Sequence, residues 1–395
     1  MSQFAVGEIK PPALSLYVHI PWCVQKCPYC DFNSHAQKGE IPQQEYIDAL
    51  LEDLQIDIDK YQLEDSPRPL HSIFIGGGTP SLITPDHIKR LIDGIQAKIP
   101  FEPEIEITME ANPGTIEAER FAEYRQAGVT RISIGVQSFE QQKLQSLGRI
   151  HGENEAVNAA KLAHTIGLNS FNLDLMHGLP DQSPEQALAD LDKAIELAPP
   201  HLSWYQLTIE PNTLFYSKPP RLPDEDDLWD IFDQGHEKLT AAGYEQYEVS
   251  GYSKPGYQCQ HNLNYWRFGD YLGIGCGAHG KLSFTDGRIV RTTKVKHPRG
   301  YLNLLKPYLD SEHEVAVEDR PFEFFMNRFR LLEACPKQDF IDTTGLGFSS
   351  IQSTLDWSFE QGYLSETETH WQITEKGKLF LNDLLEAFMA EESES

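Results

Sequence analysis

Three cysteines within eight residues are the strongest chemical signal in this 395-residue sequence. They stand at the end of a predicted strand, in the segment His19-Ile-Pro-Trp-Cys23-Val-Gln-Lys-Cys27-Pro-Tyr-Cys30. Three thiolates at this spacing can wrap one cubane iron–sulfur cluster and leave one of its irons without a protein ligand. That open position lets a substrate or cofactor bind the iron. The segment therefore predicts a [4Fe-4S] cluster on Cys23, Cys27 and Cys30.

Zinc is the main alternative for this cysteine group. A structural zinc site takes four ligands, commonly as two separated pairs, and His19 or His35 could supply the fourth ligand here. A single tight group of three thiols favours the cluster instead. The other cysteines, Cys259, Cys276 and Cys335, stand alone and are predicted to be small buried hydrophobic side chains. Clustering of this kind in a cytosolic chain indicates metal binding, not a disulfide framework.

A run of glycines follows the second predicted strand, in Phe74-Ile-Gly76-Gly77-Gly78-Thr79-Pro80. The run lacks the Gly-Lys-Ser/Thr ending of a phosphate loop, and Ser81 stands where a dinucleotide fingerprint would have its last glycine. Consecutive glycines let a backbone approach a ligand closely, and they suit a tight strand-to-helix turn equally well. The residues alone leave both interpretations open.

The elements that would position these motifs repeat through the first 210 residues: an apolar, β-rich run, a Gly- or Pro-marked turn, then a helical stretch. The predicted strands are Leu14–Ile20, Ser72–Ile75, Glu104–Met109, Arg131–Val136, Ser170–Met176 and Leu202–Ile209. The predicted helices are Gln44–Ile58, Pro85–Ala97, Ile116–Ala127, Asn154–Thr165 and Pro184–Leu197. This alternation predicts an α/β fold built from βα units around a parallel sheet. Six units are too few for a closed eight-stranded barrel, so we expect a partial (β/α)6 TIM-type barrel with its functional residues at the C-terminal ends of the strands.

The pattern changes after Glu210. Residues 211–227 are rich in Pro and Asp, a helix is predicted over Leu228–Ala242, and Tyr244–Phe284 is rich in Gly and aromatic residues with little periodicity. Beyond residue 320 the predicted order is helix, helix, hairpin and helix: Phe322–Leu332, Ile351–Gln361, Tyr363–Ile373, Lys376–Phe388. We therefore predict a partial barrel with the cluster site over 1–215, a connector and aromatic-rich region over 216–315, and a small, mostly helical, winged-helix-like domain over 316–395.

Charge excludes one class of partner. The chain has 60 Asp and Glu against 33 Lys and Arg, a formal net charge of −27. A polyphosphate backbone is repelled by that average field, and the winged-helix-like region is itself strongly acidic, so nucleic acid is not expected as a partner. One basic group is predicted to be a solvated loop or edge strand: Arg288, Arg291, Lys294, Lys296 and Arg299.

Neither a membrane span nor a secretion signal is predicted. No run approaches the roughly 18 apolar residues that a transmembrane helix needs. Residues Met1 to Lys10 are mixed and polar, unlike a signal peptide. The sequence predicts a cytoplasmic protein.

The cysteine segment resembles the radical S-adenosylmethionine (SAM) superfamily, whose signature is Cys-x3-Cys-x2-Cys with an aromatic residue before the last cysteine. Tyr29 fills that aromatic position. The resemblance implies that the amino and carboxylate groups of SAM bind the open iron and that Tyr29 packs beside the adenine. One-electron reduction would then cleave SAM to methionine and a 5′-deoxyadenosyl radical. The glycine run is similar to the glycine motif of the superfamily, which holds the SAM amino group and carboxylate.

Motifs in series resemble a narrower family, the oxygen-independent coproporphyrinogen III oxidases, which have a partial TIM barrel. The motifs are Tyr17-x-His-Ile-Pro-x-Cys, Gly-Gly-Gly-Thr-Pro, Glu110-Ala-Asn-Pro-Gly, Gly135-Val-Gln137-Ser, Leu147-Gly-Arg149-x-His151 and Asp174-x-Met-His-Gly-Leu-Pro. The resemblance places SAM contacts on Tyr17, Gly77, Gly78, Thr79, Glu110, Gln137, Arg149 and Asp174. Chemistry agrees in kind, because Glu110 and Asp174 can accept hydrogen bonds from ribose hydroxyls or an amino group and Arg149 can pair with a carboxylate.

Two departures argue against decarboxylase activity. The oxidases carry a fourth cysteine two residues after the third, where this chain has Phe32, and they have a longer segment before the cluster than the 22 residues here.

One further motif, His261-Asn262-Leu263-Asn264-Tyr265-Trp266, is similar to the His-Asn-x-x-Tyr-Trp motif of the HemW-type branch, oxidase-like proteins regarded as haem chaperones. His261 or Tyr265 could ligate haem iron, and Trp266 could cover the macrocycle. A histidine satisfied within an aromatic-rich core is the alternative. On a helix, His261 and Tyr265 would share a face.

The sequence therefore leads to one hypothesis with two alternatives. The hypothesis is a radical SAM-type haem chaperone that binds a [4Fe-4S] cluster, SAM and haem, receives electrons from a donor, and delivers haem to acceptor proteins such as membrane-associated respiratory enzymes. The first alternative is a coproporphyrinogen III dehydrogenase that decarboxylates propionates through the adenosyl radical. The second is a redox-sensing iron–sulfur scaffold without SAM turnover.

Overall fold

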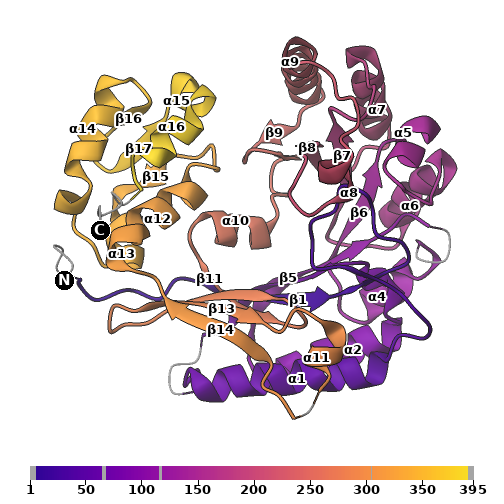
Figure 1. Cartoon of the computed structure of the whole chain (residues 1–395), viewed down its shortest axis with the longest axis horizontal. Helices are drawn as coiled ribbons and strands as arrows, with labels where there is room; N and C mark the ends of the chain where they lie inside the picture. Colours follow the sequence, from indigo (N-terminus) through magenta and orange to yellow (C-terminus); the bar gives the residue numbers. More distant parts are fainter. Residues whose placement is uncertain (1–5, 65–67, 115–117, 304, 390–395) are drawn as a thin grey trace.

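Six parallel strands form the centre of the protein, as the sequence predicts. The computed structural model describes residues 6–64, 68–114, 118–303 and 305–389. The strands lie side by side in chain order (Figure 1). They are β1 Leu14–Ile20, β4 Leu70–Gly77, β5 Phe101–Ala111, β6 Arg131–Gln137, β7 Ser170–His177 and β8 His201–Gln206. The predicted strand Leu14–Ile20 has the same bounds as β1, and the others differ by a few residues at their ends.

Helices cover the outer face of this sheet (Figure 1). They are α1 Gln43–Lys60, α2 Pro85–Gln96, α4 Phe121–Gln126, α6 Glu153–Thr165 and α7 Pro184–Glu196. Apolar side chains alternate along each strand and are fully buried against the helices, for example Leu16, Ile73 and Leu173. The first two residues of the predicted helix Ile116–Ala127 lie outside the described residues. The partial (β/α)6 barrel is confirmed.

The opposite row of strand side chains is largely polar, with apolar exceptions such as Phe74, and faces the barrel interior. Ser15 and Ser72 are hydrogen-bonded across β1 and β4 at 2.8 Å, and the Asn172 amide donates to the hydroxyls of Ser133 at 2.7 Å and Ser203 at 2.9 Å. Helix α10, Gln260–Trp266, closes this interior near the N-terminal ends of β1 and β4, because Asn264 donates to Ser15 at 2.8 Å. The open end of the polar interior therefore lies at the C-terminal ends of the strands.

The aromatic-rich stretch without clear periodicity is not irregular. It contributes β9 Glu245–Gln246, β10 Gly251–Ser253, β11 Asp270–Ile274 and β12 His279–Ser283, followed by β13 Ile289–Lys294 and β14 Leu309–Glu314. These strands extend the barrel sheet on both sides to twelve strands, in the order β14-β13-β12-β11-β1-β4-β5-β6-β7-β8-β10-β9. The strands are short, so alternation is hard to read from them. The predicted boundaries after residues 215 and 315 stay predictions.

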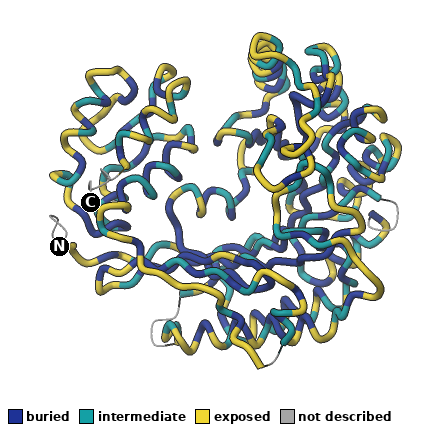
Figure 2. Tube along the Cα trace, in the orientation of Figure 1, coloured by how far each residue is buried: buried dark blue, intermediate teal, exposed yellow. Residues whose placement is uncertain are grey.

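A small, mostly helical domain ends the chain, as predicted, and it has a three-stranded sheet where the sequence predicted a hairpin. Its helices are α12 Arg320–Arg328, α13 Lys337–Thr344, α14 Gln352–Glu360, α15 Glu375–Leu379 and α16 Leu381–Glu386. Its strands are β15 Cys335–Pro336, β16 Leu364–Glu366 and β17 His370–Ile373, in the order β15-β17-β16. The predicted last helix is divided in two at Phe380. The domain has its own aromatic core, and its outer surface is exposed (Figure 2). No helix in the described ranges is long and apolar enough to cross a membrane.

Most of the basic group at 288–299 is neutralised. Arg288 pairs with Asp286 and Arg291 with Glu323. Lys294, at the end of β13, is 1% exposed and pairs with Asp53 at 2.5 Å and Asp57 at 2.8 Å on α1. Because β13 belongs to the added strands and α1 to the first βα unit, this buried triad fastens the extension to the barrel.

Removing Lys294 should therefore weaken the whole fold. We expect Lys294→Met to lower the free energy of unfolding by about 3–5 kcal/mol, because two buried carboxylates lose their counter-charge. The exposed neighbour Lys296 gives a control, since Lys296→Met should change it by no more than about 0.5 kcal/mol. Denaturant unfolding monitored by tryptophan fluorescence measures both.

The loss in Lys294→Met should also depend on pH. Burial raises the pKa of Asp57 to about 6 and raises that of Asp53, even with Lys294 present. Without the lysine both pKa values rise further, so a lower pH favours the uncharged acids, whereas at a higher pH burial opposes the ionisation that solvent would favour. The loss should be larger at pH 8 than at pH 5. Equal losses at both pH values would contradict this account.

Candidate cofactor site

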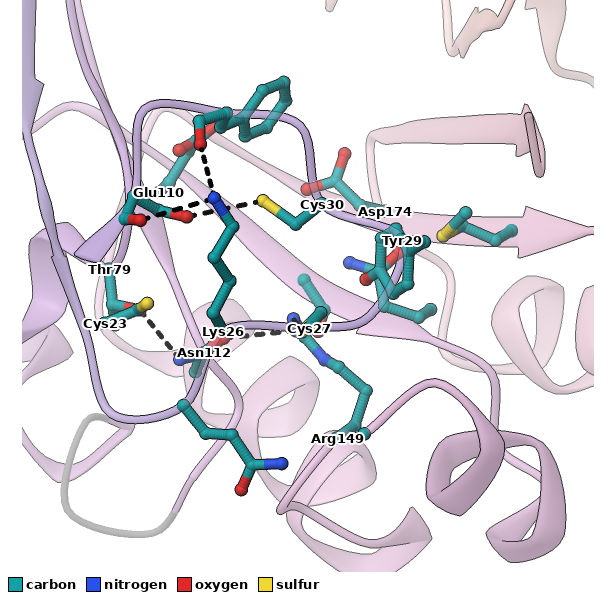
Figure 3. A pocket seen from close by; sticks show the side chains of 18 of the residues that line it. Cys23, Lys26, Cys27, Tyr29, Cys30, Thr79, Glu110, Asn112, Arg149 and Asp174 are labelled. Carbon is teal, nitrogen blue, oxygen red and sulfur yellow. Dashed lines mark hydrogen bonds between the residues drawn. The ribbon is translucent and has the colours of Figure 1, made fainter. Parts of the chain in front are cut away.

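A cavity of about 430 Å³ opens at the C-terminal ends of the barrel strands (Figure 3). All three clustered cysteines line it. The structure brings them together with eight of the nine predicted SAM contacts: Tyr29, Gly77, Gly78, Thr79, Glu110, Gln137, Arg149 and Asp174. The exception is Tyr17. Residues that are more than 150 positions apart in the sequence thus face one space.

The cysteines lie on a loop, residues 23–30, that we call the cluster loop. Strand β2, Trp22–Cys23, enters the loop and pairs with β3, His35–Ala36. The Lys26 ammonium donates to the carbonyls of Phe32 at 3.1 Å and Ser34 at 3.4 Å and so ties the loop to the segment after it. In this arrangement the described residues contain no group of His, Cys, Asp and Glu side chains already gathered to hold a metal ion.

Whether the site suits a [4Fe-4S] cluster is therefore judged from the side chains that could ligate it. Cys23 is buried, whereas Cys27 and Cys30 are partly exposed, and burial raises the pKa of the Cys23 thiol. Three thiols on one short loop against one cavity suit a cubane with one open iron. His19 and His35, the alternative fourth ligands for zinc, do not line the cavity.

Arg149 supplies the positive side of the cavity. Its guanidinium donates to Cys27 Sγ at 3.7 Å, to Asn112 Oδ1 at 3.1 Å and to the Gly135 carbonyl at 2.6 Å. The guanidinium is thus a fixed cation in the wall of the cavity, beside one of the three cysteines. It can also pair with a ligand carboxylate.

Glu110 and Asp174 supply the acidic side. Burial, and then the charge of Asp174, raises the pKa of Glu110 to about 8. Burial also raises the pKa of Asp174, whose carboxylate accepts hydrogen bonds from Ser133 and Asn172 at 2.7 Å each. Two carboxyls in one enclosed space are stabilised by a cationic ligand group. With Arg149 opposite, the cavity suits a ligand that carries both an ammonium and a carboxylate.

The glycine run forms a turn in which a Cβ at Gly77 or Gly78 would clash with neighbouring atoms. Gly77 has φ +117°, and a Cβ there would lie 2.6 Å from the His19 ring; a Cβ on Gly78 would lie 2.5 Å from the Trp22 carbonyl oxygen. The Gly77 amide donates to Glu110 at 2.9 Å, and the Gly78 amide donates to the Ile20 carbonyl at 2.7 Å. The turn is tight, as the second interpretation requires, and Gly77 and Gly78 line the cavity; the approach to a ligand stays a prediction.

Tyr17 stands behind this turn instead of lining the cavity. His19 Nε2 donates to the Asn33 carbonyl at 2.9 Å, so its Nδ1 accepts from the Tyr17 hydroxyl at 2.9 Å. Burial lowers the pKa of His19 to about 4, which keeps the ring neutral. Tyr17 thereby orients the ring against which Gly77 packs.

Asn112 and Ser133 were missed as individual site residues. Asn112 lines the cavity and donates to Thr79 Oγ1 at 3.4 Å, while Ser133 lines it and holds Asp174. Asn112 is part of the Glu110-Ala-Asn-Pro-Gly motif, so the sequence could have predicted it as a site residue from that motif. Ser133 carried none, because an inward-facing serine is visible only once the strand register is known.

The aromatic motif lies apart from the cavity, on α10. His261 is 9% exposed, its ring stacks on Phe74 with 5.0 Å between ring centroids, and its Nδ1 is 3.5 Å from Ser72 Oγ. Tyr265 is 36% exposed and packs against Trp266 and Tyr271. The two residues differ in exposure: His261 is covered by Phe74 of β4, whereas Tyr265 packs on Tyr271 of β11 and stays exposed.

Comparison with known proteins shows which family has this arrangement of residues. Residues 17–194 match the model of the radical SAM superfamily, and residues 315–380 match that of the HemN C-terminal domain. The chain is 66% identical over 97% of its length, and 100% of the relative's, to a protein of Escherichia coli named heme chaperone HemW. The chain belongs to the HemW family of radical SAM proteins. Relatives with the same name in Haemophilus influenzae and Bacillus subtilis are 63% and 34% identical, over 97% and 95% of this chain.

The HemW-family fold is shared with a solved enzyme. Coproporphyrinogen III oxidase (HemN) of Escherichia coli, a radical SAM enzyme, superposes with a TM-score of 0.79 over 96% of this chain and 90% of its own, at 23% sequence identity. At that identity the likeness shows the fold alone. Phe32, where the sequence resemblance leads one to expect a fourth cysteine, is 59% exposed and lines the cavity.

The tight contact at Gly77 gives a test of the site. In Gly77→Ala the new methyl group must displace the His19 ring, so we expect a loss of about 1–3 kcal/mol in stability and about tenfold or more in SAM affinity. Gly39 is a matched control: it also has a positive φ, +90°, but nothing lies within 4 Å of a Cβ there. Gly39→Ala should show the backbone strain alone, about 1 kcal/mol, with unchanged SAM affinity. Calorimetric SAM titration and denaturant unfolding measure both; equal SAM affinity in the two variants would contradict the assignment.

Proposed function

We propose that this HemW-family chain is a haem chaperone that carries a [4Fe-4S] cluster, binds SAM beside it, binds haem, and delivers haem to acceptor proteins. The observation that carries the proposal is the single cavity that gathers the three cysteines with eight of nine predicted SAM contacts. The 66% identity to a protein named heme chaperone HemW supports the haem part. The cytoplasmic location stays a prediction.

In this proposal Cys23, Cys27 and Cys30 would hold three irons of the cluster and leave the fourth without a protein ligand. When bound, the cluster supplies an electron and an open coordination position. Arg149 pairs with the SAM carboxylate, and the Gly77–Thr79 backbone orients it. Glu110 and Asp174 accept hydrogen bonds from the amino group and ribose. The buried walls of the cavity exclude water from the cofactor, which strengthens each of these contacts.

Haem is proposed to bind at α10. Burial lowers the pKa of His261 to about 3, so its imidazole is neutral, the form that ligates iron. Ligation by His261 requires α10 to move away from Phe74, whereas Tyr265 is reachable where it stands. Trp266 packs edge-on against Tyr265, with 5.0 Å between ring centroids, so a macrocycle over the phenol would also contact the indole. Acceptors are proposed to include membrane-associated respiratory enzymes, and an electron donor serves the cluster.

The cluster can be tested first. Anaerobically reconstituted protein should hold about four irons and four sulfides and absorb broadly in the visible range. Replacing Cys23, Cys27 or Cys30 with Ala should abolish this absorbance, since each supplies one of only three thiolates. Cys335→Ala, in the C-terminal domain, is the control that should keep it. One equivalent of zinc without iron would favour the zinc alternative, and a full cluster in a variant that lacks all three cysteines would refute the site.

Haem binding and porphyrinogen conversion can be tested on one reconstituted sample. Haem titration should shift the Soret band, and coproporphyrinogen III should not be converted to protoporphyrinogen IX at an enzymatic rate. His261→Ala and Tyr265→Phe should both weaken haem binding with the cluster intact. Tyr257→Phe, which removes the hydroxyl of an exposed tyrosine outside α10, is the control.

Each outcome separates the candidates. Multiple turnovers of coproporphyrinogen III would establish the dehydrogenase instead of the chaperone. An unchanged Soret titration in both α10 variants with intact cluster would remove α10 as the haem site. Absence of 5′-deoxyadenosine after reduction with SAM present would favour the redox-sensing scaffold.

A further inference from the structure

A second cavity, of about 520 Å³, lies on the other side of the cluster loop. It opens between that loop, α5 (Gln141–Ser146) and the segment that leads into α8 (Leu214–Ser217). We call it the outer groove. Cys27 and Cys30 line both the outer groove and the cofactor cavity, whereas none of the nine predicted SAM contacts lines the groove. The cluster loop is therefore a thin wall with a cofactor cavity on one side and open surface on the other.

The groove is free of carboxylates. Its lining is Gln25, Lys26, Cys27, Pro28, Cys30, Gln145, Ser146, Gly148, Asn212, Thr213 and Leu214. Lys26 is the charged side chain of this lining, in a chain with 60 acidic residues. Lys143 and Arg149 are close by along the chain, but Lys143 is buried and Arg149 faces the cofactor cavity. The nearest carboxylates along the chain, Asp31, Glu140 and Glu210, do not line the groove. Lys26 and Lys218 are exposed, so the charge that the groove itself presents is positive, on a strongly negative protein.

The groove is also held in place. The Phe215 amide donates to the Pro28 carbonyl at 3.0 Å, which ties the start of α8 to the cluster loop. Thr213 caps α8 by accepting from the Tyr216 amide at 3.1 Å. Leu214, which lines the groove, is 57% exposed. The result is a fixed surface with an apolar centre and cations beside it, the composition of a small, transient protein interface.

We propose that the outer groove is the docking site of an acidic one-electron carrier protein that reduces the cluster. The inference rests on the proposed cluster. SAM and the open iron would occupy the cofactor cavity, so a reductant has to reach the cluster from the other face, where Cys27 and Cys30 line the groove. One electron passes from the reduced carrier to the cluster, the carrier is oxidised, and no atom is transferred.

Charge selects the carrier. A net charge of −27 repels an acidic protein from most of this surface, so only a carboxylate-free patch can receive it. Complementary charge steers the encounter and raises the association rate more than it raises affinity. This suits electron-transfer complexes, whose interfaces are small and short-lived.

Two isosteric substitutions test the charge without touching the cluster loop. Gln145→Glu and Asn212→Asp place carboxylates in the groove, and both side chains are exposed and outside the cofactor cavity. Gln96→Glu and Asn158→Asp, exposed on α2 and α6, which line neither cavity, form the matched control with the same change in net charge. All proteins are first compared for iron content, so a failure of the proposed cluster is recognised before the groove is tested.

Cluster reduction is then followed by stopped-flow loss of visible absorbance, with reduced flavodoxin as the acidic protein donor and photoreduced deazaflavin as a small neutral donor. At low ionic strength the groove double variant should react with flavodoxin about tenfold more slowly than the control double variant. The difference should vanish in about 1 M salt, where charges are screened beyond about 3 Å. Both variants should react equally with deazaflavin.

Equal rates of the two double variants with flavodoxin at low salt would overturn the proposal. An equal loss of rate with both donors would also overturn it, because the new carboxylates would then act on the cluster itself and not on a docked protein.

Discussion

The alternation of side chains along six parallel strands is the constraint on which the rest of the structure depends. One row of each strand is apolar and packs against the outer helices, so the other row must face the interior, and here most of that row is polar. Polar groups away from water need partners. Near the N-terminal ends of β1 and β4 they find them in one another and in α10, but at the C-terminal ends Glu110, Asp174 and Arg149 face a cavity. The site is thus the unfilled end of a buried polar layer.

Periodicity is why the barrel could be predicted. Each of its strands carries a local apolar signal and is followed by a helix with one apolar face, so β1 and α2 were located within a residue or so from the sequence. Strands β10 to β13 have no such signal, because they hold three to six residues and are defined by their neighbours in the sheet. Their pairing depends on non-local contacts such as the buried Lys294–Asp57 pair, which no window along the sequence contains.

The candidate site divides in the same way. The cysteine spacing and the glycine turn each involve a few adjacent residues, so both can be recognised in the sequence. The placement of Tyr17 is not local: its ring points inward from β1, but the glycine turn and the His19 ring lie between it and the cavity. The different exposure of His261 and Tyr265 has a related reason. Spacing along a helix tells which residues share a face, but not that β4 would cover one end of that face and leave Tyr265 exposed.

These two departures belong to one chain of contacts. His261 stacks on Phe74 at 5.0 Å, Phe74 stacks on Tyr17 with 6.3 Å between centroids, and the Tyr17 hydroxyl is bonded to His19, whose ring packs on Gly77. The proposed haem motif and the glycine turn of the cofactor cavity are therefore the two ends of one row of rings. Protein interiors are close-packed, so a ring in such a row cannot move without space from its neighbour. If His261 moves toward a ligand, Phe74 must move with it to keep the interior packed. Phe74 in turn contacts Tyr17, whose hydroxyl fixes the His19 ring beneath Gly77.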